Sequence, residues 1–98
     1  MTVYVDHARI PFRGFLMCHL FADTSEELHE MAARIGLKRS WYQRGEVLEH
    51  YDVSLSKRKL AIQCGAVEIG TIRLRAMIRQ RMAQRERKIA ASPHNKTG

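Results

Sequence analysis

The segment 49–54, Glu-His-Tyr-Asp-Val-Ser, places an imidazole, a phenol, a carboxylate and a hydroxyl group close together. Imidazole and carboxylate groups are what a general acid–base pair, or a divalent metal of borderline softness, requires. The same groups recur where two other hydrophobic runs end, at Asp6 and His7 and again from His19 to Asp23. Because ligands in α/β sheets bind at the carboxyl ends of strands, we expect these three junctions to form one pocket at the sheet edge.

Nine residues form the predicted ligand-binding set: Asp6, His7, Arg9, His19, Asp23, Arg39, His50, Tyr51 and Asp52. Each also has an ordinary structural explanation. His7 and Arg9 suit a solvated loop. His19 suits the interior of an apolar strand, and Asp23 suits a helix cap. The histidine spacing matches no established metal motif, so a divalent metal ion is an alternative, and no catalytic residue is assigned.

Arginines in the predicted loops near these junctions favour a phosphorylated ligand; they include Arg9, Arg13, Arg39 and Arg44. Arginine binds phosphate through two parallel hydrogen bonds, and a helix N-terminus adds N–H donors. Solvated surface arginines are the alternative explanation. The sequence has neither a Walker loop nor a dinucleotide-binding glycine motif, which argues against a nucleoside triphosphatase.

Hydrophobic patterning predicts the strands and loops that position these groups. Residues 15–21 are so apolar that we expect a central strand covered on both faces, with His19 inside it. The other predicted segments are a strand at 2–6, loops at 7–14 and 37–49, an extended piece near Val53 and a strand at 66–69.

Helix 25–36 has the clearest local signals. Thr24 is the predicted N-cap, Glu27 falls at the third position of a capping box, and Gly36 suits a left-handed C-cap. Two further helices are predicted, at 56–64 with Ser56 as N-cap and at 71–90. Together these elements predict a small single α/β domain with a mostly parallel sheet of three to four strands and three helices.

The net charge is concentrated at one end of the chain. Residues 1–70 hold nine Lys/Arg and nine Asp/Glu, whereas 71–98 hold eight Lys/Arg and a single Glu, so the whole excess of +7 lies there. Because Arg81 lies on the apolar stripe of helix 71–90, we expect that helix to leave the globule near Met82. The predicted division is therefore an α/β domain at 1–82 and a basic helical extension with a disordered tail at 83–98.

A basic helix suits nonspecific binding of nucleic acid, because phosphate contacts require charge but no sequence readout. The alternatives are a solvated helix and an oligomer-forming one. The predicted nucleic-acid-binding residues are Arg73, Arg75, Arg79, Arg81, Arg85, Arg87 and Lys88.

The chain shows no signature of a membrane or secreted protein. No apolar run approaches the roughly 20 residues that span a bilayer, and the N-terminus lacks the basic and apolar regions of a signal peptide. Cys18 and Cys64 are expected to be reduced thiols. These features predict a cytoplasmic location and no membrane partner.

Short segments in a fixed order between residues 2 and 70 resemble a known family. They are Thr2–Asp6, Met17–Leu20, Ala22–Thr24, Glu27–His29, Ala32–Ala33, Ile35–Gly36, Arg39–Gln43, His50–Val53, Leu55–Arg58, Ala61–Ile62 and Gly65–Glu68. This string is similar to domain-of-unknown-function family 4031. The resemblance implies a single domain of a bacterial or phage protein, and it brings no activity or catalytic residue with it.

Two functions follow from these features. The first is a small binding protein whose His/Asp/Arg pocket holds a nucleotide or nucleic acid, acting in nucleic-acid metabolism or host defence. The alternative is a metal-dependent phosphoester hydrolase that uses the same pocket. A homo-oligomer and a host protein remain open as partners.

Overall fold

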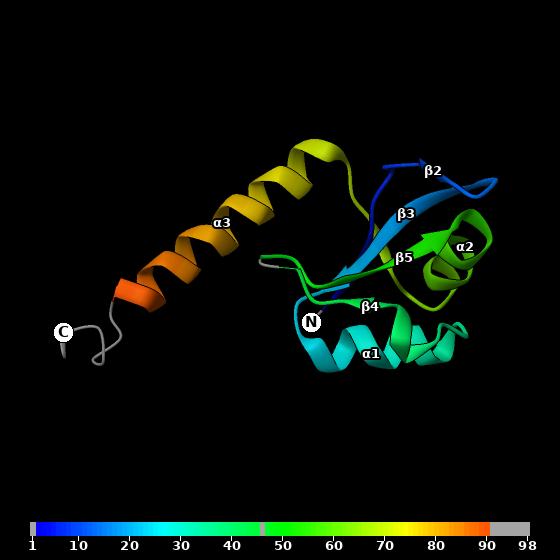
Figure 1. The fold of residues 1–98 in the computed structure, drawn as a ribbon, viewed down its shortest axis with the longest axis horizontal. Helices are drawn as coiled ribbons and strands as arrows, with labels where there is room; N and C mark the ends of the chain where they lie inside the picture. Colours follow the sequence, from blue (N-terminus) through cyan, green and yellow to red (C-terminus); the bar gives the residue numbers. More distant parts are fainter. Residues whose placement is uncertain (1, 46, 91–98) are drawn as a thin grey trace.

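The computed structural model describes residues 2–45 and 47–90, so the predicted disordered tail lies outside the described residues. The described chain forms one six-stranded sheet with three α-helices and a short 3₁₀ turn (Figure 1). In chain order the elements are β1 (Val3–Val5), β2 (Ile10–Phe12), β3 (Phe15–Ala22), α1 (Ser25–Arg34), the 3₁₀ turn Arg39–Trp41, β4 (Tyr42–Gln43), β5 (His50–Ser54), α2 (Leu55–Gln63), β6 (Val67–Glu68) and α3 (Thr71–Ala90).

The strand order is β4-β5-β3-β1-β6, with β2 also paired to β3. Strand β3 is antiparallel to β1, β2 and β5, and the β1–β6 pair is the parallel one. The prediction of a mostly parallel sheet is therefore wrong. The cause is the segment predicted as loop 7–14: it contains β2, and Arg13 and Gly14 have φ of 47° and 83°. Positive φ at both central residues is the geometry of a type I′ turn, which joins antiparallel strands.

The predicted helices are present, with small shifts at their ends. The Thr24 hydroxyl accepts the Glu27 N–H and donates to the Glu27 carboxylate, so the N-cap of α1 is confirmed. Gly36 has φ of 84°, and the N–H of Leu37 bonds the carbonyl of Ala32, which is a Schellman ending. Helix α2 starts one residue earlier than predicted, because Ser54 caps it instead of Ser56.

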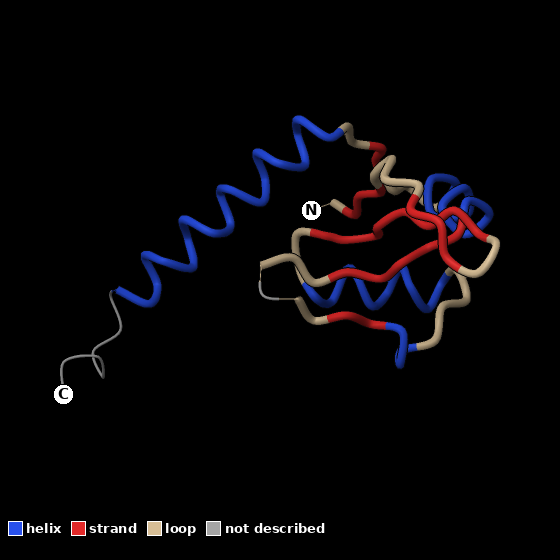
Figure 2. Tube along the Cα trace, turned by 45° about the horizontal axis from the view of Figure 1, so that its top comes forward, coloured by secondary structure: helices blue, strands red, loops and turns tan. Residues whose placement is uncertain are grey.

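Different helices cover the two faces of the sheet. Helices α1 and α2 pack on one face, where Val5, Leu20 and Val53 are fully buried in the main core. On the other face, Tyr4 and Phe21 pack under the first turns of α3. The alternation of β3 places Met17 and His19 on the same face as Phe21. We call this remainder of the second face the open face, and no helix of the described chain lies over it (Figure 2). The expectation that 15–21 is covered on both faces is therefore correct for one end of β3 only.

Helix α3 packs through its first half and extends away from the sheet in its second half (Figure 1). Leu74 and Met77 contact the small core, whereas every residue from Gln84 to Ala90 is exposed. Arg81 was predicted to contact nucleic acid, but it is half-buried and donates to the carbonyl of Ala22 at 2.8 Å.

No helix among residues 2–45 and 47–90 is long and apolar enough to span a membrane.

Candidate metal centre

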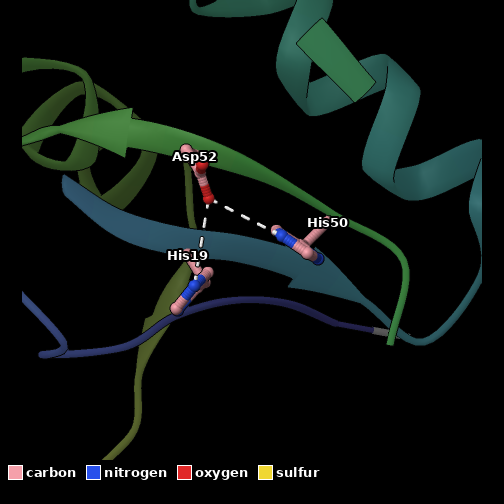
Figure 3. Close-up of side chains that lie close together, drawn as sticks. All are labelled: His19, His50 and Asp52. Carbon is pink, nitrogen blue, oxygen red and sulfur yellow. Dashed lines mark ion pairs between the residues drawn. The ribbon is translucent and has the colours of Figure 1, made fainter. Parts of the chain in front are cut away.

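Two histidines and one aspartate meet on the open face of the sheet. His19 of β3 lies directly opposite Asp52 of β5 in the antiparallel register. His50 precedes Asp52 by two residues in the same strand, so both point to the same face. Figure 3 shows the three side chains converging between β3 and β5. Pairing of the strands therefore builds the cluster, and it lies on a face of the sheet instead of at the strand ends.

One donor atom from each side chain lies within 4.8 Å of the other two. Asp52 Oδ1 is 3.6 Å from His50 Nε2 and 3.9 Å from His19 Nε2. Ligand atoms around a tetrahedral zinc ion are about 3.4 Å apart, given metal–ligand bonds near 2.1 Å. Small rotations of partly exposed side chains would bring these atoms into that geometry.

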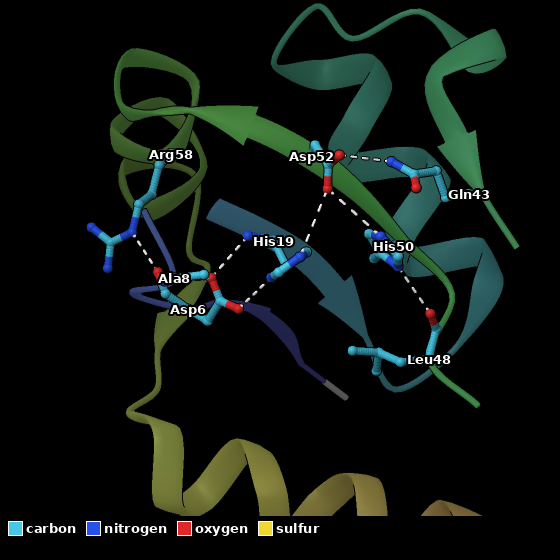
Figure 4. Close-up of polar contacts among 8 residues, drawn as sticks. All are labelled: Asp6, Ala8, His19, Gln43, Leu48, His50, Asp52 and Arg58. Atoms are coloured by element: carbon cyan, nitrogen blue, oxygen red, sulfur yellow. Dashed lines mark hydrogen bonds and ion pairs between the residues drawn. The ribbon is translucent and has the colours of Figure 1, made fainter. Parts of the chain in front are cut away.

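His19 is held by a buried carboxylate. Its Nδ1 lies 2.6 Å from Asp6 Oδ2, while Asp6 Oδ1 accepts the backbone N–H groups of His19 and Ala8 (Figure 4). Burial raises the pKa of Asp6, but these three hydrogen bonds outweigh burial and hold the pKa below its ordinary value. Because an ionised carboxylate is only an acceptor, Nδ1 must donate. The Nε2 atom of His19 is thereby directed toward Asp52.

The hydrogen bond to Asp6 raises the pKa of His19, and the negative charges of Asp6 and Asp52 raise it further. Burial acts in the opposite direction but is outweighed. An imidazole in this setting is more basic than usual. A more basic imidazole is also a stronger electron-pair donor once its Nε2 is deprotonated, which is the effect that a carboxylate partner has on histidine ligands of metals.

The other two side chains are oriented in the same way. His50 Nδ1 donates to the carbonyl of Leu48 at 3.0 Å, which leaves Nε2 facing Asp52. Asp52 Oδ2 accepts from the Gln43 side chain at 2.8 Å, which leaves Oδ1 between the two imidazoles. All three donor groups thus have a partner on the side away from the cluster, the arrangement that metal sites use to orient their ligands.

The cluster opens into a hollow of about 180 Å³. The three donor groups line it together with Gln43 on one side, and the wall on the other side is apolar. That wall is formed by Ile10, Pro11, Phe12 and Met17. Two histidines and a carboxylate leave coordination positions for water or substrate, as in catalytic zinc sites, and the hollow gives access to them.

The structure brings four members of the predicted set together: Asp6, His19, His50 and Asp52. Two others are exposed and do not line the hollow. His7 is exposed, with Nδ1 3.1 Å from Arg58, and Arg9 is exposed with φ of 52°.

Three members lie elsewhere. The buried Tyr51 points into the opposite face and hydrogen bonds His29, and Arg39 lies 5.8 Å from the centre of the Tyr42 ring. Asp23 accepts from the Tyr4 hydroxyl and the N–H of Thr2. It borders a second hollow, of about 500 Å³, between α1, α3 and the segment before β5.

Residues that support the centre but were not predicted are Gln43, Leu48 and Arg58. Gln43 lay in a segment without periodicity, and Leu48 acts through its backbone carbonyl, which no sequence pattern reveals. Arg58 donates Nε to the carbonyl of Asp6 and Nη2 to Glu68, so it anchors the backbone that carries the buried carboxylate.

Comparison with known proteins gives one result. The model of a protein family described as "Protein of unknown function (DUF4031)" matches residues 3–81. Searches of curated proteins and of solved structures gave no match. The family match includes every residue of the candidate metal centre and the first half of α3.

Proposed function

We propose that this chain, which belongs to the DUF4031 family, holds one divalent transition metal ion at His19, His50 and Asp52 and uses it to hydrolyse phosphoester bonds. The observation that carries the proposal is the cluster of three donor groups, each oriented by its own hydrogen-bond partner. Nitrogen and carboxylate ligands in this ratio suit zinc and its neighbours better than magnesium.

A divalent ion in an open site polarises a phosphoryl oxygen and makes water a stronger nucleophile at neutral pH. In the overall reaction the water oxygen bonds to phosphorus, the ester P–O bond breaks, and a proton from water ends on the leaving oxygen. His19 and His50 direct their Nδ1 protons away from the hollow, so their Nε2 atoms face it and would serve as ligands of the ion.

Charge supports an anionic substrate. The chain carries +7. Helix α3 lies on the same sheet face as the centre, because its Leu74 packs against the small core that contains Phe21, and Phe21 is two residues from His19 in β3. Arg9 and Arg13 lie at either end of β2, next to the hollow. A phosphate approaching the cluster thus meets positive charge on the rim.

A second candidate, binding of a phosphorylated ligand without turnover, uses the same hollow. Among the described residues, the titratable groups that line it are the three donor groups themselves. A hydrolase usually has a further acid or base within reach of the reacting atoms. That feature favours the binding protein, and a turnover assay separates the two candidates.

The test is a calorimetric titration of the metal-stripped chain with Zn²⁺, Mn²⁺, Fe²⁺ and Mg²⁺, followed by assays on phosphomonoester and phosphodiester substrates. Iron(II) is included because two histidines and a carboxylate also form non-haem iron centres. We expect one tightly bound ion per chain and metal-dependent release of alcohol. Tight binding without turnover supports the second candidate, and failure of all four ions to bind overturns both the metal site and the hydrolase.

The basic helix provides a separate prediction about nucleic acid. Replacing Arg79, Arg87 and Lys88 with Gln should weaken binding of single-stranded DNA uniformly across sequences. Each phosphate contact contributes about 0.7 to the slope of log affinity against log salt concentration, so the slope should fall by about 2. Fluorescence anisotropy at several salt concentrations measures both quantities.

The matched control replaces three cations outside α3, Arg34, Lys38 and Lys59, with Gln, which removes the same charge from another part of the domain. We expect its salt slope to equal that of the unmodified chain. If the salt slope fell by the same amount in both triple variants, net charge would explain the effect and α3 would make no specific phosphate contacts.

A further inference from the structure

An apolar strip borders the metal centre on the open face of the sheet. In the β2–β3 hairpin, Ile10 pairs with Met17 and Phe12 pairs with Phe15. Side chains two apart in a strand share a face, so Phe15 and Met17 lie on the same face as His19. Their partners Ile10 and Phe12 lie there too. The donor cluster and the strip therefore form one continuous surface.

Large apolar side chains of this strip are exposed to a degree that core packing does not explain. The exposed fractions are 50% for Ile10, 55% for Phe12 and 61% for Phe15. Ile10, Phe12 and Met17 also line the hollow that contains the donor groups. An exposed apolar wall next to a polar cluster is typical of a site that binds a ligand with an apolar part and a charged part.

Positive charge flanks the strip. The guanidinium of Arg13 lies 5.2 Å from the centre of the Phe12 ring. Arg9 and Arg13 are the non-glycine residues with positive φ in the described chain, and they lie immediately before and after β2. The left-handed conformation is unfavourable for residues with a side chain, so the hairpin holds these two cations next to the strip at some cost in stability.

We propose that the strip of Ile10, Phe12, Phe15 and Met17 binds a nucleobase adjoining the phosphate at the metal centre, so that the substrate is single-stranded nucleic acid. This inference rests on the proposed phosphoester chemistry and specifies its substrate. Bases stack on aromatic side chains with little sequence preference, and arginine beside the ring strengthens such stacking. A single strand is required because the bases of a duplex have their faces covered by their neighbours.

A second copy of the chain is a less suitable binding partner for the strip than a nucleobase. A symmetric contact through the hairpin would bring Arg9 and Arg13 of both copies together, and like charges at an interface are unfavourable. A stable interface also takes about 20 residues on each side, whereas the strip consists of four side chains. A base with its phosphate matches both the apolar wall and the flanking cations.

The experiment compares Phe12→Ala with Leu16→Ala, which removes another exposed apolar side chain from the opposite face of the same hairpin. Fluorescence anisotropy with Zn²⁺ present measures binding of a labelled pentathymidylate and of an abasic strand of equal length. Electrophoresis verifies that the strands stay intact. We expect Phe12→Ala to weaken pentathymidylate binding about tenfold and to leave abasic binding unchanged, with Leu16→Ala matching the unmodified chain.

The inference is overturned if the unmodified chain binds both strands equally, or if Leu16→Ala loses as much affinity as Phe12→Ala. It is also overturned if sedimentation shows a dimer that Phe12→Ala dissociates, because a second copy then occupies the strip. Calorimetry of Zn²⁺ on the same samples separates the two proposals: base-dependent binding by a chain that takes up no metal supports the strip and overturns the hydrolase. Phe12 is exposed, so the variant should fold, and its thermal melting verifies this.

Discussion

Replacing His19 with Ala should abolish the stabilisation that Zn²⁺ confers on the folded chain. An ion that binds only the folded state stabilises it by about 2.7 kcal/mol when its concentration is 100 times the dissociation constant. For a domain of this size that corresponds to a rise in melting temperature of roughly 10 °C or more. With one of three ligands removed, we expect the ion to bind more than 100-fold more weakly and the rise to disappear, because loss of an outer-shell partner alone costs up to about 100-fold.

The matched control is His7→Ala, which removes an exposed imidazole from the same region of the chain. His7 Nδ1 lies against Arg58 and not against the donor cluster. Differential scanning fluorimetry with and without Zn²⁺ compares the two variants, and an activity assay follows with the same samples. An equal thermal shift in His19→Ala and His7→Ala would mean that zinc binds elsewhere, and the assignment of the centre would be abandoned.

Helix positions could be predicted from the sequence because their signals are local. The Thr24–Glu27 capping box and Gly36 act within one turn of the chain, and α1 has the expected ends to within two residues. The antiparallel sheet could not be predicted in this way. The direction of β3 relative to β2 depends on the hairpin turn at Arg13 and Gly14. Arginine is not among the residues that usually mark a type I′ turn.

The grouping of Asp6, His19, His50 and Asp52 was expected on a different physical basis from the one observed. Strand ends were expected to converge at an edge, whereas the donor groups meet on a face through the register of β3 with β5. Alternation within a strand tells which residues share a face, but it does not tell which strand lies alongside or in which register. The apolar strip could not be predicted for a related reason: Pro11 and the flanking arginines are typical of a loop, whereas the segment forms β2.

Asp6→Asn should weaken metal binding although Asp6 contacts no ion. Asp6 is 2% exposed and accepts three hydrogen bonds, two of them from backbone N–H groups. An asparagine has one acceptor oxygen and an NH₂ group that only donates. If the oxygen serves the two backbone N–H groups, the NH₂ faces Nδ1 of His19. That nitrogen must then accept, and the proton moves to Nε2, the atom that would bind the ion.

We therefore expect Asp6→Asn to lower Zn²⁺ affinity by about 10- to 100-fold, the usual effect of losing the carboxylate partner of a histidine ligand. We also expect it to lower the free energy of unfolding by about 1–3 kcal/mol, because buried hydrogen bonds are lost. Calorimetry measures the first quantity and urea unfolding of the metal-free chain measures the second. Nitrogen-15 chemical shifts of the His19 ring report its tautomer directly, and a merely structural role of Asp6 would not change them.

Asp23→Asn provides the control, since Asp23 also accepts a side-chain and a backbone hydrogen bond, just after the end of β3, but does not line the hollow of the centre. It should lose stability while binding zinc with unchanged affinity and keeping the His19 tautomer. If both variants lost zinc affinity in proportion to their lost stability, Asp6 would act on the fold as a whole and not on the orientation of one imidazole. If Asp6 orients the His19 ring, zinc affinity should fall in Asp6→Asn and not in Asp23→Asn. The His19 ring proton should also move to Nε2 in Asp6→Asn alone.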